Sequence, residues 1–270
     1  MFGPCVHGPA FEASPIQICA YVRFAGAIGS LKWKGIEFID HHDHGRELQT
    51  AVSYDSLGEG ENPTEAGARS DGGAPISSSL LLGMKALGPT LATTSRMAFW
   101  KPFHGAKLSK TLLSKKVSIG WHEFPNVVQY DVSLRVAETH TRVAFEALTA
   151  YLPASFDQFY TYRAGHLTPL SSPPGELAMA HQLKPIIVAD RRHGVAMGIV
   201  SLEPALYGNG VFTNYHVTKW NVFFDEKPAS PPATYSHEIL LAIGTLSDVE
   251  RAMDAMTSTV QSDGNLQIAR

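Results

Sequence analysis

The chain has 270 residues, 44% of them hydrophobic and 17% charged, a composition typical of a folded globular protein rather than of a disordered, collagen-like or coiled-coil chain. The formal net charge of −3 provides no basic face for nucleic acid, and no apolar run is long enough to predict a transmembrane helix. We therefore expect neither nucleic acid nor a membrane as a partner. All-β sandwiches commonly reach this length as one unit, so we expect a single domain over residues 1–270.

The N-terminal residues and the cysteines bear on where the protein works. Residues 1–5 lack the charged and apolar regions of a signal peptide. The chain as written is therefore expected to be cytoplasmic, or secreted or periplasmic if a signal peptide has been removed. Cys5 and Cys19 could pair in an oxidising compartment, but two free, buried thiols are the slightly favoured interpretation. The chain has no Cys-x-x-Cys motif, so a thiolate zinc site is not expected.

Alternation of apolar and polar residues is the dominant pattern, and it is clearest over residues 127–136. Every second residue from Val128 to Val136 is apolar and the residues between them are polar, as in a half-buried strand. Residues 142–151 repeat the pattern after a short polar turn, so the two segments predict an antiparallel pair. Further strands are predicted at 16–23, 28–33, 36–39, 47–54, 79–87, 90–99, 115–122, 185–189, 194–201, 211–224 and 234–244.

The remaining segments complete the predicted architecture. Residues 55–78 and 163–184 are rich in Gly, Pro and Ser, which predicts long loops that are either functional or disordered. One helix is predicted near the C-terminus, because Ser247 and Glu250 form a capping-box pattern and the apolar residues that follow recur on one face. Together these patterns predict an all-β, antiparallel β-sandwich with one short C-terminal helix.

In the first predicted hairpin, residues 26–31 (GAIGSL) form an apolar strand ending in Ser-Leu, and residues 33–38 (WKGIEF) return through a glycine turn. This hairpin is similar to that of galactose-mutarotase-like proteins. In that family a site segment containing Arg follows, and residues 43–46 (DHGR) occupy this place. The resemblance implies a β-supersandwich fold, shared by sugar epimerases, many polysaccharide lyases and parts of several glycoside hydrolases. By position, the catalytic glutamate of the epimerases would correspond to Glu226 or Glu238.

The polar run over residues 40–46 (DHHDHGR) is the strongest candidate for part of an active site. His44 is a candidate acid–base group because imidazole titrates near neutral pH. Arg46 is a candidate for substrate binding because its guanidinium matches a carboxylate, such as that of a uronic acid. The alternative is a polar loop in which Arg46 makes a surface ion pair. No cofactor is expected; a divalent metal, if present, would use His42 and His44, whose His-x-His spacing suits metal ligands.

Further candidates come from loops and strand ends that could share one rim of the sandwich. The acidic loop after residue 54 supplies carboxylates for acid–base chemistry, and residues 211–224 are expected to form one strand whose mixed aromatic and polar face suits a sugar. The other candidate catalytic residues are Glu59, Glu65, His122, Tyr160 and His216. The other candidate substrate-binding residues are Tyr54, Asn62, Tyr162, Arg163, Asn214 and Trp220. Each of these residues, taken alone, is more often structural.

These patterns predict a carbohydrate-active enzyme that cleaves or rearranges a sugar by side-chain acid–base chemistry, of the polysaccharide lyase or glycosidase type. Two alternatives remain open: a sugar epimerase with a His acid and a Glu base, and a non-catalytic carbohydrate-binding protein. A metal-dependent enzyme is a further alternative. The expected partner is a carbohydrate, and the sequence indicates no particular oligomeric state. The motifs for nucleotide binding and for serine hydrolases do not occur.

Overall fold

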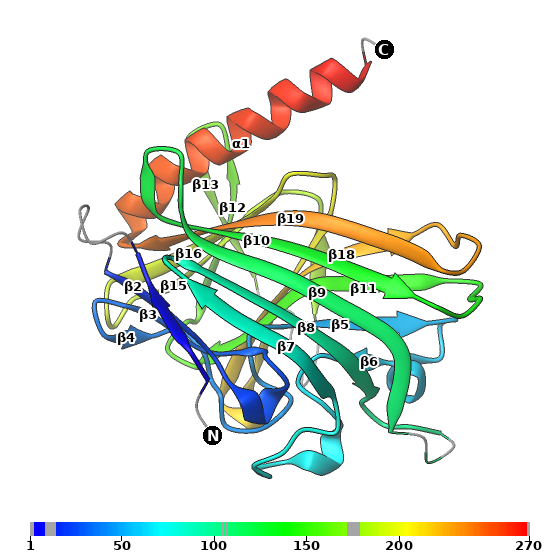
Figure 1. Cartoon of the computed structure of the whole chain (residues 1–270). Helices are drawn as coiled ribbons and strands as arrows, with labels where there is room; N and C mark the ends of the chain where they lie inside the picture. Colours follow the sequence, from blue (N-terminus) through cyan, green and yellow to red (C-terminus); the bar gives the residue numbers. More distant parts are fainter. Residues whose placement is uncertain (1–2, 9–14, 104, 106, 172–178, 269–270) are drawn as a thin grey trace.

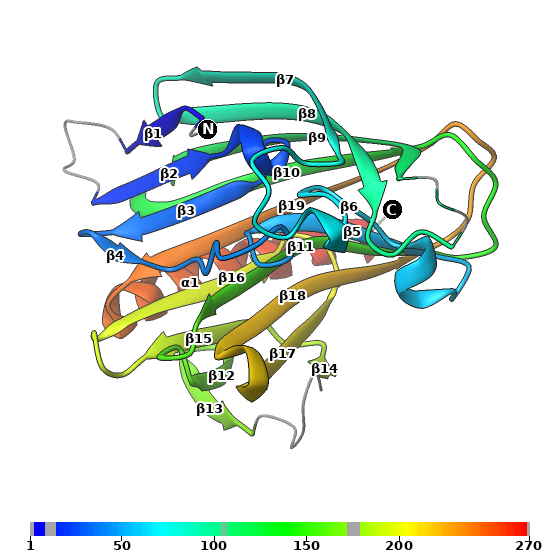
Figure 2. The same cartoon turned by 90° about the horizontal axis from the view of Figure 1, so that it is seen from below.

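The computed structural model describes residues 3–8, 15–103, 105, 107–171 and 179–268. They form two antiparallel β-sheets, several short 3-10 turns and one α-helix (Figure 1, Figure 2). The predicted all-β sandwich with a C-terminal helix is therefore confirmed. No helix in the described part of the chain combines the length and the apolar character that crossing a membrane requires.

The smaller sheet has four strands and the larger has fifteen. The smaller sheet contains β1 (Cys5–His7), β2 (Ile16–Ala20), β3 (Ile28–Trp33) and β4 (Ile36–Glu37), paired in that order. The strands of the larger sheet are β5 (Gln49–Tyr54), β6 (Pro63–Thr64), β7 (Leu80–Leu87), β8 (Thr90–Phe99), β9 (Leu108–Trp121), β10 (Phe124–Val136), β11 (Val143–Pro153), β12 (Gln158–Arg163), β13 (His166–Leu170), β14 (Ala180–Gln182), β15 (Ile186–Asp190), β16 (Val195–Ser201), β17 (Leu206–Phe212), β18 (Val217–Glu226) and β19 (Ala233–Gly244). Their order is β13-β12-β15-β16-β19-β10-β9-β8-β6-β5-β11-β18-β17-β14, with β7 beside β8.

The main core lies between two halves of the larger sheet. Strands β10 and β19 contribute Tyr130 and Leu241 from one half, and β11 and β18 contribute Phe145 and Trp220 from the other; all four are 0% exposed. Figure 2 shows β8 and β9 on one side of the molecule and β18 and β17 on the other. The alternation in β10 causes this burial, because it places every apolar side chain of the strand on the core face.

The helix α1 (Leu246–Ile268) covers part of the outer face of the large sheet, against β16 and β19 (Figure 1). Its buried side chains include the predicted Val249, Met253 and Met256. The N-terminal cap differs from the prediction. Thr245 Oγ1 accepts a hydrogen bond from the backbone N–H of Asp248 at 3.2 Å, so the cap residue is Thr245 rather than Ser247.

The structure corrects three expectations about the chain. Cys5 and Cys19 form a disulfide with an S–S distance of 2.00 Å, so the slight preference for free thiols was wrong. Residues 211–224 are not one strand, because the 3-10 turn η5 (Thr213–Tyr215) and the left-handed His216, at φ 52°, separate β17 from β18. The expected loop at 163–184 contains β13 and β14, while its residues 172–178 lie outside the described residues.

Candidate functional site

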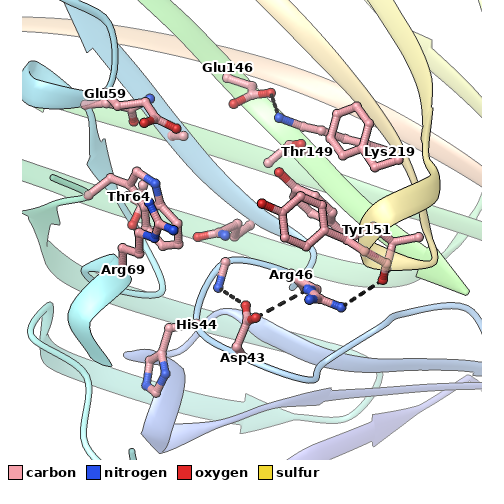
Figure 3. Close-up of a pocket in the computed structure, with 18 of the residues that line it drawn as sticks. Asp43, His44, Arg46, Glu59, Thr64, Arg69, Glu146, Thr149, Tyr151 and Lys219 are labelled. Carbon is pink, nitrogen blue, oxygen red and sulfur yellow. Dashed lines mark hydrogen bonds and ion pairs between the residues drawn. The ribbon is translucent and has the colours of Figure 1, made fainter. Parts of the chain in front are cut away.

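A cavity of about 520 Å³ lies beside strands β5, β11 and β18, at the end where the loop over residues 43–46 meets η5 (Figure 3). Two further 3-10 turns adjoin it, η3 (Gly58–Glu61) and η4 (Arg69–Asp71). Polar, charged and aromatic side chains together line this space, as is usual for a small-molecule site. The lining residues are Asp43, His44, Gly45, Arg46, Gln49, Ala51, Glu59, Asn62, Thr64, Arg69, Gly72, Trp100, Lys101, Glu146, Thr149, Tyr151, Phe212, Tyr215, Val217 and Lys219.

The charged centre of the cavity is formed by Glu146, Tyr151 and Lys219. Tyr151 on β11 is directly opposite Lys219 on β18 in the strand pairing. Strict alternation would place residues 146 and 151 on opposite faces of β11. However, the pairing of β11 with both neighbouring strands shifts register after Glu146, and this bulge brings both side chains to the same cavity.

The contacts of this group fix its protonation states. Lys219 Nζ lies 3.0 Å from Glu146 Oε1 and 5.2 Å from the centre of the Tyr151 ring. Burial would raise the pKa of Glu146, but the charge of Lys219 and hydrogen bonds, including one from Asn221 Nδ2 at 2.5 Å, outweigh it and lower the pKa. Burial raises the pKa of Tyr151, and Lys219 offsets only part of this rise. Burial would lower the pKa of Lys219, but Glu146 and Tyr151 raise it overall. At neutral pH the group is therefore a carboxylate, a neutral phenol and an ammonium.

His181 lies at the edge of this group. It is opposite Gly208 in the pairing of β14 with β17. A Cβ atom built on Gly208 would lie 3.0 Å from His181 Nε2 and 2.2 Å from Asn221 Oδ1, so the glycine leaves the room that these two side chains occupy. Burial lowers the pKa of His181, with Glu146 opposing this effect and Lys219 adding to it. A neutral imidazole therefore stands beside the asparagine that binds Glu146.

None of these residues was among the candidates from the sequence, although two of them are charged residues within segments that are otherwise predicted to be buried strands. Glu146 stands in the apolar run from Phe145 to Leu148, and Lys219 stands between Thr218 and Trp220. A charge within a strand that is otherwise buried needs a partner. The two residues satisfy each other across neighbouring strands, a pairing that the sequence alone does not show.

Arg46 lines the cavity as predicted, but its guanidinium already has partners. Its Nε lies 3.3 Å from Asp43 Oδ2, and its Nη1 lies 3.3 Å from Asp40 Oδ2 and from the carbonyl oxygen of Tyr215. Asp43 in turn accepts a hydrogen bond from the backbone N–H of Gly45 at 2.9 Å. Arg46 therefore joins the loop over residues 43–46 to η5 through Nε and Nη1, and its charge is balanced by two carboxylates.

His44 also lines the cavity, with only 1% of its surface exposed. Its Nδ1 contacts the carbonyl oxygen of Gly72, and its Nε2 lies 2.8 Å from the carbonyl oxygen of Arg23. Its ring also packs edge-on against Phe24, 5.1 Å away between centres. Both ring nitrogens are thus occupied by the backbone, and the side chain is placed as a structural link rather than as an acid–base group.

Two glycines, one in the cavity lining and one beside it, lie under aromatic rings. A Cβ on Gly45 would lie 2.6 Å from the Trp100 ring, and a Cβ on Gly60 would lie 1.9 Å from the Phe103 ring. Lys101, between these two aromatic residues, forms an ion pair with Glu59. The segment after β8 therefore packs closely onto both neighbouring loops and holds an indole at the cavity.

The acidic loop supplies two of its candidates to the cavity. Glu59 lines it, but its side chain is 58% exposed and is paired with Lys101. Asn62 lines it too, and its Oδ1 is buried without a hydrogen-bond partner among the described residues. Glu65 lies elsewhere, because it is fully buried and forms an ion pair with Lys115 inside the sandwich.

The structure does not bring the other candidates to this cavity. Tyr54 is buried, with its hydroxyl 2.7 Å from Thr111 Oγ1, and Trp220 is part of the main core. His122 and Arg163 are exposed near strand ends. The Tyr160 hydroxyl forms a hydrogen bond with the side chain of Gln158 at 3.0 Å. The Tyr162 hydroxyl donates a hydrogen bond to Asp254 of α1 at 2.5 Å. Asn214 and His216 are exposed, in and just after η5, and neither residue lines the cavity. These placements follow from the interruption at residues 213–216 and from the position of β12 at the far end of the sheet.

The two other sequence-based options concern metal and the epimerase glutamate. Among the described residues, no group of three or more His, Cys, Asp and Glu side chains is arranged to hold a metal ion, and His42 is exposed. Glu226 Oε1 lies 2.5 Å from His237 Nε2, and Glu226 lines a different cavity. Glu238 lines neither of these two cavities. The carboxylate that the structure places in the cavity from a central strand is Glu146.

Solved structures show what this architecture is similar to. A galactose mutarotase related enzyme from Lactobacillus acidophilus has a TM-score of 0.53 and 8% identity over 91% of this chain and 98% of that one. A galactose mutarotase-like protein from Lactobacillus casei has a TM-score of 0.54 and 9% identity over 90% of this chain and 100% of that one. An alpha-galactosidase from Geobacillus stearothermophilus has a TM-score of 0.50 and 9% identity over 90% of this chain and 41% of its own length.

The chain matches no protein-family model and no curated protein. The fold is that of galactose-mutarotase-like proteins, as the resemblance of residues 26–46 implied. It also occurs within carbohydrate-active enzymes such as the alpha-galactosidase. At these identities the similarity shows the fold alone, and the chemistry has to be argued from the cavity.

Proposed function

We propose that this protein is a carbohydrate-active enzyme that binds a sugar in the cavity and transforms it by side-chain acid–base chemistry. One observation carries the proposal: Glu146 and Tyr151 face the same cavity in opposite protonation states, with Lys219 against both. A carboxylate can accept a proton and a neutral phenol can donate one, which are the two roles that sugar rearrangement requires. The ammonium of Lys219 stabilises the phenolate that forms when Tyr151 donates.

The shape and lining of the cavity support a sugar as the ligand. Its volume of about 520 Å³ lies within the range of small-molecule sites. Trp100, Phe212 and Tyr215 offer aromatic surface to C–H groups, and Asn62, whose Oδ1 has no partner among the described residues, can accept a hydrogen bond from a hydroxyl. The same combination would serve a binding protein without activity, so the acid–base pair is the feature that favours an enzyme.

Among the reaction types considered, proton transfer without hydrolysis fits the lining best. A glycosidase needs a carboxylic acid that stays protonated to protonate the leaving group. The carboxyl groups that face the cavity are instead paired with cations: Asp43 with Arg46, Glu59 with Lys101 and Glu146 with Lys219. The phenol of Tyr151 therefore takes the part of the acid, as in an epimerase or a lyase.

For an aldose epimerase, the steps follow from the two groups. Glu146 accepts the proton of the anomeric hydroxyl while Tyr151 donates its proton to the ring oxygen, so the C1–O5 bond breaks and the open aldehyde forms. Rotation about C1–C2 and the reverse transfers close the ring as the other anomer and restore both residues. This reaction needs no group beyond those in the cavity, and we favour it. Lyase-type elimination from a uronate is the second candidate, because Arg69 also faces the cavity and has no anionic partner among the described residues.

The test is a comparison of two activities in two variants. Anomer exchange of free aldoses, measured by NMR, should fall by about 10²–10⁴-fold in Tyr151→Phe and Glu146→Gln. Tyr160→Phe and Glu138→Gln are matched controls outside the cavity and should keep the wild-type rate. Absorbance near 235 nm with uronate polymers reports elimination instead. Sugar binding with neither activity, or activity unchanged in both cavity variants, would refute the proposal.

A further inference from the structure

Among the charged residues that line the cavity, Arg69 is the one for which no ion pair is found within the described part of the chain. Four cationic side chains and three anionic ones line it. Arg46, Lys101 and Lys219 each form an ion pair with a carboxylate. The guanidinium of Arg69 has neither an ion pair nor a hydrogen bond to any residue that the structure describes, and Arg69 is a solvent-exposed residue of the cavity lining.

The backbone that carries Arg69 is held firmly in place. Its own N–H donates to the carbonyl oxygen of Trp100 at 3.0 Å, and its carbonyl oxygen accepts from the N–H of Gly72 at 3.3 Å. Asp71 closes the turn, since its carboxylate accepts from the N–H of Ala68 at 3.0 Å. Because this backbone is fixed, only the side-chain torsions of Arg69 remain to be ordered when a ligand binds.

The position of Arg69 relative to the reacting groups is also defined. Figure 3 shows Arg69 on the opposite side of the cavity from Tyr151 and Lys219. A sugar whose anomeric end contacts Glu146 and Tyr151 would therefore point its far end toward Arg69. A planar guanidinium with free donors matches carboxylate or phosphate oxygens, which accept two parallel hydrogen bonds from it.

We propose that Arg69 makes the cavity selective for a sugar that carries an anionic group, a carboxylate or a phosphate, at the end away from the reacting carbon. This inference rests on the proposed function, because it assumes that a sugar occupies the cavity. Arg69 is here a specificity residue, and it takes over the role that the sequence suggested for Arg46. A bound anion would give Arg69 the ion pair that the other three cationic side chains of the cavity already have.

Calorimetric titration of the full chain tests the proposal with four probes: galacturonate against galactose, and glucose 6-phosphate against glucose. At low salt the wild type should bind at least one acidic probe about ten-fold or more tightly than its neutral counterpart. Arg69→Gln should reduce this ratio to about two-fold or less and leave the affinity for the neutral sugar unchanged. Raising the salt to about 0.5 M should also reduce the ratio, because an exposed charge pair is screened.

Arg163→Gln removes an exposed arginine outside the cavity and is the matched control, so it should keep the wild-type ratio. Galacturonate and glucose 6-phosphate distinguish a carboxylate from a phosphate as the anionic group. A preference for either probe over its neutral counterpart supports the proposal. Equal affinity for acidic and neutral probes in the wild type would overturn it while leaving the proposed function intact. Equal weakening of both probes in Arg69→Gln would overturn it as well, since Arg69 would then act only on the shape of the cavity. Failure of every probe to bind would refute both proposals.

Discussion

The backbone N–H of His44 donates to the carbonyl oxygen of Gly72 at 3.2 Å, and the imidazole of the same residue contacts that oxygen too. Through these contacts His44 fastens η4 to the loop over residues 43–46. Its other ring nitrogen reaches the carbonyl oxygen of Arg23, which extends the link to a third segment. A residue whose sequence context suggests acid–base chemistry therefore acts on the site by holding the turn that carries Arg69.

Replacing His44 with Ala should lower the stability of the protein. The change removes the imidazole contacts with the carbonyl oxygens of Gly72 and Arg23 and empties a buried site against Phe24, so the free energy of unfolding should fall by about 2–4 kcal/mol. Urea unfolding followed by fluorescence measures this change. His42→Ala, at an exposed position, should shift the midpoint very little. If instead His44→Ala abolishes turnover and leaves stability intact, His44 is a catalytic residue after all.

Adding one methyl group at Gly45 should displace the indole ring of Trp100, which lines the cavity. The Cβ of Gly45→Ala would lie 2.6 Å from Trp100 Cη2, so the ring must move away. Loss of an aromatic contact of this kind should weaken sugar binding by about 2–10-fold and change the intrinsic fluorescence. Gly73→Ala is the control, because no atom lies within 4 Å of its added Cβ. Unchanged affinity in Gly45→Ala would show that Trp100 does not contact the sugar.

The ion pair of Lys115 and Glu65 should behave as a buried structural pair. Both side chains are 0% exposed. Lys115→Met leaves the carboxylate of Glu65 without its partner inside the sandwich, so we expect a loss of about 3–5 kcal/mol in the free energy of unfolding. The double variant Lys115→Met/Glu65→Leu removes both charges and should recover most of this loss. If the double variant is as unstable as the single one, packing rather than charge accounts for the effect.

Asp55 should contribute stability that disappears in acid. Burial would raise the pKa of Asp55, but hydrogen bonds from His140, Thr141 and Arg142 outweigh it and lower the pKa to about 2. A depressed pKa in the folded state stabilises the protein above the unfolded value, near 3.9, and the contribution is lost as the pH falls toward about 2.

The measurement for Asp55 is urea unfolding of the wild type and Asp55→Asn at several pH values. The difference should be about 1–2 kcal/mol at pH 7 and should shrink between about pH 5 and pH 2. Asp157→Asn, at an exposed aspartate, should show no such trend. A constant difference for Asp55→Asn across this range would mean that ionisation of Asp55 does not contribute.

The sequence predicted most of the strands, because a half-buried strand shows itself as an alternation of apolar and polar residues with a period of two. In β10, alternation from Val128 to Val136 is enough to predict both the strand and its buried face. The apolar face of α1 was predicted for the same reason. The break between β17 and β18 was missed, since alternation on either side of η5 continues through it in the sequence.

The candidate site was predicted only in part, for physical reasons that apply to particular residues. The loop over residues 43–46 was found from its composition, as were Glu59 and Asn62. Glu146 and Tyr151 share a face only because of a bulge, which no periodic pattern indicates. Whether Arg46 or Arg69 has a free guanidinium depends on neighbours distant in the chain, so the sequence could not distinguish them.

The hydrogen bond from Arg46 to the carbonyl oxygen of Tyr215 joins residues that are 169 positions apart. Bringing together residues so far apart in the chain costs loop-closure entropy, which the other contacts of the folded protein must offset. The cavity therefore exists only in molecules whose early and late segments have already docked. A ligand that binds in this cavity would therefore shift the folding equilibrium of the whole chain toward the native state.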